Sequence, residues 1–141
     1  MDMIGSIVVQ PLYYGCMAEG LLAAGRTDDA VHAAATGLMV AQHHGVRISE
    51  IDLHRIQGDL ILAVDPTRRA EAELSYRRAM TLAQECGARF FELRATAALC
   101  RSMRERGEGD EGRRILGAIH AQMTEGFQLA DLQGVQEMLT N

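Results

Sequence analysis

The chain has 141 residues, of which 48% are hydrophobic and 23% are charged, and its formal net charge is −5. This size and composition predict one soluble domain with a sizeable core, while an acidic chain without tryptophan or lysine is a poor nucleic-acid binder. With no apolar run near the ~18 residues of a membrane span, no basic leader and no C-x-x-C pair, we predict a cytoplasmic protein with reduced thiols and no membrane partner.

Apolar residues recur at helical spacing in the first third of the chain. They predict a first helix over about residues 8–24, which ends at a glycine. A second helix is predicted over about residues 27–45. Thr27 can cap its start, and the two aspartates that follow suit the positive end of a helix.

The middle of the chain carries two further helix-start signals. Ser49 and Asp52 resemble a capping box at the start of a third helix, predicted to continue to about residue 64. Asp65 and the proline after it predict the N-cap and first position of a fourth helix, which should reach Cys86.

The last third predicts helices over about residues 90–106 and 110–124, and a short amphipathic helix over about 129–139. Strand-like alternation is confined to the first residues, so the predicted fold class is all-α. Because the connections are short, neighbouring helices should pack antiparallel. One domain spanning 1–141 is therefore predicted, with helical hairpins at about 8–45, 49–87 and 90–124 and a C-terminal capping helix at about 129–139.

Small residues recur at matching places in the three predicted hairpins. In the first helix of each pair they are Ala18, Gly58 and Cys100, spaced 40 and 42 residues apart. The second helices share positions at offsets of four and seven residues: Ala30, Ala34 and Gly37; Ala72, Tyr76 and Ala79; Gly112, Leu116 and Ile119. This is the pattern of tetratricopeptide repeats with lengthened second helices, although Ala34 and Ile119 depart from it in size. It predicts a right-handed superhelix of about three hairpins, in which Gly58 is a notch for the partner helix.

Three stretches resemble one known group of proteins: "DLHRIQGDLIL", "AEAELSYRRAMTLAQECGARFFELRATAALCRSMRERGE" and "MTEGFQLADLQGVQEML". They are similar to the tetratricopeptide-like region at the C-terminal end of large bacterial signalling proteins. Those proteins carry a nucleotide-cyclase or DNA-binding domain and a signal-transduction ATPase. The resemblance covers the chain from about Tyr13 onward. It implies a helical superhelix used for protein contacts, ligand sensing or self-association, and it implies no catalysis.

Apparent catalytic motifs have simpler interpretations. "GEGDEG" at residues 107–112 matches a dinucleotide loop, but its acidic residues would repel phosphates, and we interpret it as a turn between helices. "HRIQGD" at residues 54–59 lacks the aspartate of a kinase loop, and His54 is interpreted as a structural histidine. His43 and His44 are adjacent and cannot share one helix face. No catalytic residue, cofactor or metal site is predicted.

The first helices of tetratricopeptide hairpins line the inner groove. Their register predicts that the groove changes from acidic to basic along its length. Three arginines at its basic end could clamp a carboxylate or an acidic peptide, or could instead pair with Glu105, Glu108 and the C-terminal tail. The charged groove residues predicted in this way are Glu19, Asp52, Arg55, Asp59, Arg94, Arg101 and Arg104.

These observations favour a non-catalytic module for protein interaction or self-association. The alternative is a regulatory domain that senses a small molecule or peptide near Arg55 and Arg101. The first helix is apolar nearly all round. We therefore expect a homodimer formed through it.

Overall fold

The computed structural model describes residues 3–122, and those residues form six helices without a strand. The predicted all-α class is confirmed for them. The predicted capping helix at 129–139 lies outside the described residues. The helices are α1 (Met3–Ala23), α2 (Thr27–His44), α3 (Arg47–Val64), α4 (Arg69–Cys86), α5 (Arg89–Glu105) and α6 (Gly109–Gln122).

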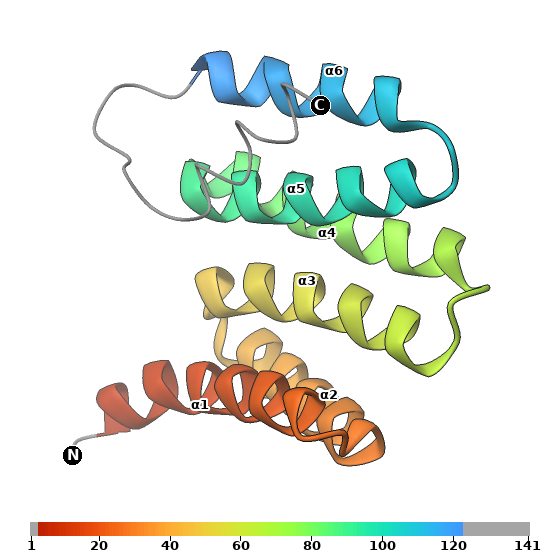
Figure 1. The fold of residues 1–141 in the computed structure, drawn as a ribbon. Helices are drawn as coiled ribbons and strands as arrows, with labels where there is room; N and C mark the ends of the chain where they lie inside the picture. Colours follow the sequence, from red (N-terminus) through yellow and green to blue (C-terminus); the bar gives the residue numbers. More distant parts are fainter. Residues whose placement is uncertain (1–2, 123–141) are drawn as a thin grey trace.

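The helices follow one another as packed pairs. Each helix packs against the next one in the chain, and α1, α3 and α5 also contact one another in that order. Figure 1 shows α1, α3 and α5 one above the other, with α2 and α4 behind them. Within the described residues, no helix has both the length and the apolarity that crossing a membrane requires.

Short glycine turns end four of these helices. Gly45 after α2 and Gly87 after α4 both have a φ of +68°, in the left-handed region that glycine adopts without strain. The amide after each glycine donates to a carbonyl five residues earlier, as in a Schellman motif. Gly25 and Gly107 make the same turn after α1 and α5. The "GEGDEG" segment therefore joins α5 to α6: its first two residues lie in the turn, as predicted, and its last four form the first turn of α6.

The predicted side-chain caps are wrong. α2 begins with Thr27 already inside the helix, and Ser49 lies within α3, which starts two residues earlier. The reason for α2 and α3 is the shortness of the turns: the residue directly after the turn glycine, Arg26 or Val46, is the N-cap, and its side chain makes no capping bond. Asp65 ends α3 instead of starting α4, because its carboxylate accepts bonds from the amide and hydroxyl of Thr67.

The small residues lie where helices approach most closely. A Cβ atom placed on Gly58 would lie 2.5 Å from Cε1 of Tyr76, so α4 packs directly on the backbone of α3 at this point. In the third hairpin, a Cβ atom on Gly112 would lie 3.3 Å from the Cα of Cys100. Ala18 is fully buried in the first hairpin. The predicted notch at Gly58 is confirmed.

A second repeat signal, absent from the sequence interpretation, lies in the turns between hairpins. The Nε2 atom of Gln42 donates to Oε1 of Glu50 at 3.4 Å, and Gln84 donates to Oε2 of Glu92 at 2.8 Å. Both pairs belong to a segment of the form Q-x-x-G-x-R-x-x-E. These bonds tie the end of one hairpin to the start of the next.

Candidate functional site

Arg55 of α3 is the centre of a polar network. Its side chain is only 9% exposed, and it donates to three carboxylates: Nε to Asp52 at 2.9 Å, Nη1 to Asp59 at 3.2 Å and Nη2 to Glu19 at 2.7 Å. Burial by itself would lower the pKa of the guanidinium, but these bonds and charges outweigh burial and raise it. Arg55 is therefore bound within the fold by three carboxylates, and the expectation that it also contacts a partner stays a prediction.

Tyr76 of α4 extends this network behind α3. Its buried hydroxyl donates to Oδ1 of Asp59 at 2.6 Å. Burial and the negative charge of Asp59 raise the pKa of Tyr76, while the positive charge of Arg101 acts in the opposite direction. The sequence analysis assigned Tyr76 to packing alone. The signal that could have revealed its second role is the presence of a phenol opposite the Gly58 notch.

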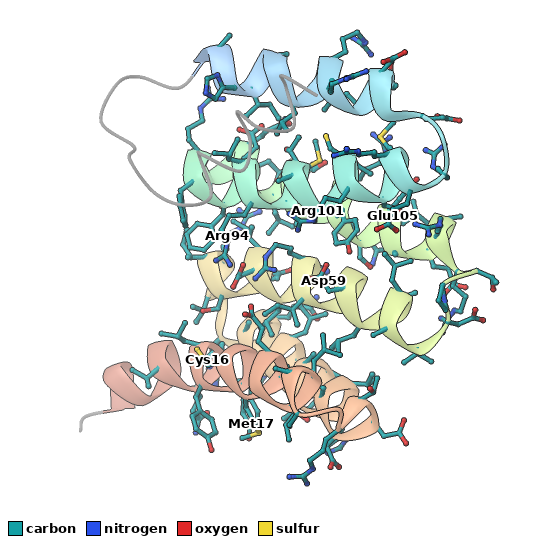
Figure 2. The ribbon with its side chains drawn as sticks, viewed as in Figure 1. Cys16, Met17, Asp59, Arg94, Arg101 and Glu105 are labelled. Atoms are coloured by element: carbon teal, nitrogen blue, oxygen red, sulfur yellow. The ribbon has the colours of Figure 1, made fainter. Side chains whose placement is uncertain are left out.

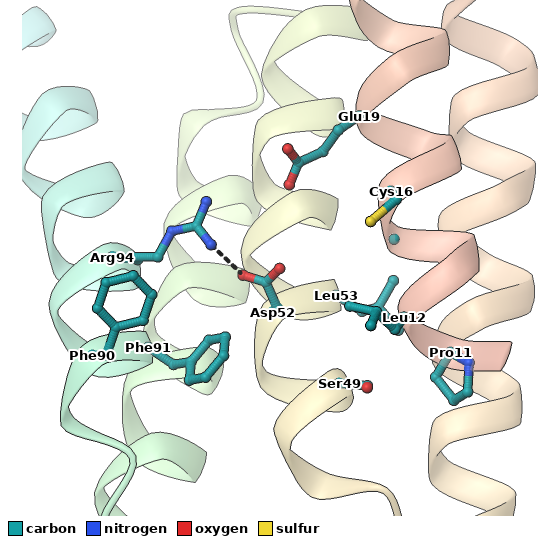
Figure 3. A pocket seen from close by; sticks show the side chains of 11 residues that line it. Pro11, Leu12, Cys16, Glu19, Ser49, Asp52, Leu53, Phe90, Phe91 and Arg94 are labelled. Carbon is teal, nitrogen blue, oxygen red and sulfur yellow. Dashed lines mark ion pairs between the residues drawn. The ribbon is translucent and has the colours of Figure 1, made fainter. Parts of the chain in front are cut away.

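A cavity of about 300 Å³ lies between α1, α3 and the start of α5 (Figure 3). Arg94 lies at its edge, 3.7 Å from a carboxylate oxygen of Asp52 and 5.8 Å from the centre of the Phe90 ring. The lining is mostly apolar, with charge at one side. The residues around the cavity are Pro11, Leu12, Gly15, Cys16, Glu19, Ser49, Asp52, Leu53, Phe90, Phe91 and Arg94.

Arg101 and Arg104 have a different environment from Arg55. Both are exposed, and neither forms an ion pair with any residue between 3 and 122. The acidic side chains expected as their alternative partners bind elsewhere: Glu105 pairs with Arg69 at 2.8 Å, and Glu108 pairs with Arg106 at 2.7 Å. The C-terminal tail lies outside the described residues.

The predicted groove residues thus fall into three groups. The first group shares one network, which consists of Glu19, Asp52, Arg55, Asp59 and, through Asp52, Arg94. Arg101 lies on α5 above Asp59 (Figure 2), close enough for its charge to act on Tyr76. Arg104 lies apart, against the turn that leads to α6, where it approaches Gly109.

His54 is a deeply buried titratable group close to this network. It is 4% exposed, its Nε2 lies 3.7 Å from Oε1 of Glu50, and its Nδ1 has no hydrogen-bond partner among the described residues. Burial lowers the pKa of His54, and the nearby charge of Arg78 lowers it further, against the opposing effect of Glu50. The expected structural role agrees with this burial.

The lowered pKa of His54 predicts a loss of stability in mild acid. The unfolded chain binds a proton more readily than the folded chain, so this contribution is present above pH 6.5 and is lost as pH falls through 6.5 toward the folded value. We expect His54→Gln to reduce the difference in free energy of unfolding between about pH 7.5 and about pH 5.5. Urea titration at both pH values measures this difference, and an unchanged difference in the variant would contradict the prediction.

Histidine and cysteine side chains are the other groups that could bind a metal or react with a substrate. Within residues 3–122, no group of three or more histidine, cysteine, aspartate or glutamate side chains could hold a metal ion. His43 and His44 meet edge to face at the end of α2. Cys100 donates its thiol to the carbonyl of Gly112, and burial raises its pKa to about 11, which disfavours the reactive thiolate.

Comparisons with protein-family models, with curated proteins and with solved structures find no match.

Proposed function

We propose that the chain is a non-catalytic protein-interaction module with a tetratricopeptide-like superhelix. In this proposal α1, α3 and α5 are the inner helices of three hairpins, and their common face binds an acidic peptide. Two features support the architecture: these helices contact one another in order, and a small residue of each first helix, Ala18, Gly58 or Cys100, is buried where the second helix packs against it. The sequence resemblance to bacterial signalling regulators suggests a role in cytoplasmic signalling.

The observation that carries the proposal is that some charged side chains along this face form ion pairs with one another, whereas others do not. One carboxylate of α1 and two of α3 are engaged with the buried Arg55, whereas Arg101 and Arg104 of α5 are exposed and unpaired among the described residues. An exposed arginine can bind a carboxylate of a partner with charge-assisted hydrogen bonds. The apolar cavity beside Phe90 would accept a hydrophobic side chain of the same peptide.

Reversing these two charges should weaken acidic-peptide binding. The probe is a labelled peptide in which glutamate and leucine alternate, and fluorescence anisotropy measures its affinity. We expect Arg101→Glu with Arg104→Glu to weaken binding at least about tenfold, which corresponds to ~1.4 kcal/mol, because attraction becomes repulsion. Circular dichroism checks that the variant remains folded.

The matched control is Arg77→Glu with Arg78→Glu on α4. These arginines are also exposed, but α4 lies behind the proposed groove. The control should bind the acidic peptide like the parent chain, and a peptide with lysine in place of glutamate should not bind. Equal weakening by both double variants, or no binding of the acidic peptide to the parent chain, would contradict the proposal.

A small-molecule sensor is the second candidate, and the cavity beside Arg94 favours it. Its volume of about 300 Å³ suits a compact ligand with one anionic group. A ligand that binds only the folded chain raises its melting temperature. A thermal-shift screen of acidic metabolites would therefore separate this role from peptide binding. A metabolite effect lost in Leu12→Trp, which fills the cavity, would favour the sensor.

A further inference from the structure

We propose that a second copy of this chain covers the outer face of α1, so that the protein is a homodimer with α1 paired against α1. The outer face consists of Val9, Tyr13 and Gly20, with Cys16 at the edge that this face shares with the cavity between α1, α3 and α5. This inference goes beyond the peptide groove and depends on different residues.

The outer face is a continuous stripe of uncharged residues. Val9 is 45% exposed and Tyr13 is 58% exposed, and Cys16 and Gly20 are also exposed. Successive spacings of four, three and four residues place all of them on one side of a helix. The opposite side of α1 holds the fully buried Ala18.

The corresponding face is a helix-packing surface in both later hairpins. If Ala18 is matched to Gly58, then Tyr13, Cys16 and Gly20 correspond to Leu53, Ile56 and Leu60 of α3, which are 1–2% exposed. Leu53 packs against the Gly37 position of α2, and Ile56 packs against the Gly15 position of α1. The α5 equivalents, Ala95, Ala98 and Ser102, are buried as well. This face therefore accepts helices wherever a neighbouring hairpin is present.

The charge of α1 argues for a second copy as the neighbour. A two-fold axis places identical side chains near one another, so a charged residue on such a face would meet its own like charge. Glu19 is the only charged residue of α1, and it turns to the groove, where it binds Arg55. The small residues Cys16 and Gly20 let a second helix approach closely. Two copies of the outer face can thus pack together without bringing like charges into contact, and the small residues allow the two helices to approach closely.

The first test is the molar mass of the chain in solution. Static light scattering across a concentration series should show a dimer that dissociates on dilution. Tyr13→Glu places two carboxylates across the interface, and it should raise the dissociation constant at least about tenfold. Because Tyr13 is largely exposed, circular dichroism should show an unchanged fold. The control Met39→Glu, at a 64% exposed position of α2, should remain as dimeric as the parent chain.

The second test measures whether Cys16 becomes shielded. Cys16 and Cys86 are both exposed in the single chain, whereas Cys100 is buried. As protein concentration rises, alkylation of Cys16 should slow, while that of Cys86 stays constant. A monomer at the highest concentration, a dimer that tolerates Tyr13→Glu, or unchanged Cys16 alkylation would each overturn the proposal. None of these results would affect the peptide test, which depends on Arg101 and Arg104.

Discussion

Replacing Gly58 with leucine should lower the free energy of unfolding by about 3 kcal/mol, the upper end of what an overpacked core costs. The Cβ atom alone would lie within 3 Å of three carbons of the Tyr76 ring. That ring is buried, and its hydroxyl is bound to Asp59, so it has little room to move away. Helix propensity acts in the opposite direction by ~1 kcal/mol and does not compensate. Urea denaturation followed by circular dichroism measures the change.

Gly20→Leu is the matched control for this prediction. Gly20 also lies inside a helix, but a Cβ atom there would meet nothing within 4 Å. At low protein concentration the same substitution should therefore leave stability unchanged or raise it by up to ~1 kcal/mol. Tyr76→Ala should partly relieve the Gly58→Leu defect, because it removes the ring that the leucine strikes. Equal stability of Gly58→Leu and the parent chain would contradict the notch.

Replacing Arg55 with methionine should cost about 3 kcal/mol of stability, the lower end of the range for breaking a buried ion pair. The variant keeps an unbranched apolar stem but leaves Glu19, Asp52 and Asp59 close together without their cation. We choose the lower end because Glu19 is half exposed and water screens its charge. Chemical denaturation of the variant and of the parent chain measures this change in stability and so tests the structural role of Arg55. Peptide affinity is measured for both proteins as well.

Two further variants show whether charge is the cause. Arg68 binds Glu71 on the exposed surface, so Arg68→Met should leave stability nearly unchanged. Adding Asp52→Asn to Arg55→Met removes one of the uncompensated charges and should restore part of the loss. If Arg55→Met were as mild as Arg68→Met, the network would contribute no more than an exposed ion pair.

The sequence determined the helices and the position of the main notch. Apolar residues at helical spacing produce α-helices under local rules, and small residues such as Gly58 mark where two helices can approach. The helix starts were less predictable. Capping rules assume a side-chain cap, whereas at α2, α3 and α5 the N-cap is the residue directly after a turn glycine and makes no side-chain capping bond.

Only the tertiary structure decided which charges are engaged and which remain open. Arg55 and Arg101 are equivalent candidates in the sequence. Arg55 is bound by Glu19 of α1, which lies 36 residues earlier in the chain. Glu105 is bound by Arg69 of α4, again 36 residues away, and therefore does not pair with the arginines of its own helix. Helix formation depends on neighbours within a turn, which the sequence lists in order. Ion pairing depends on distances between groups that are remote in the chain, and packing alone sets those distances.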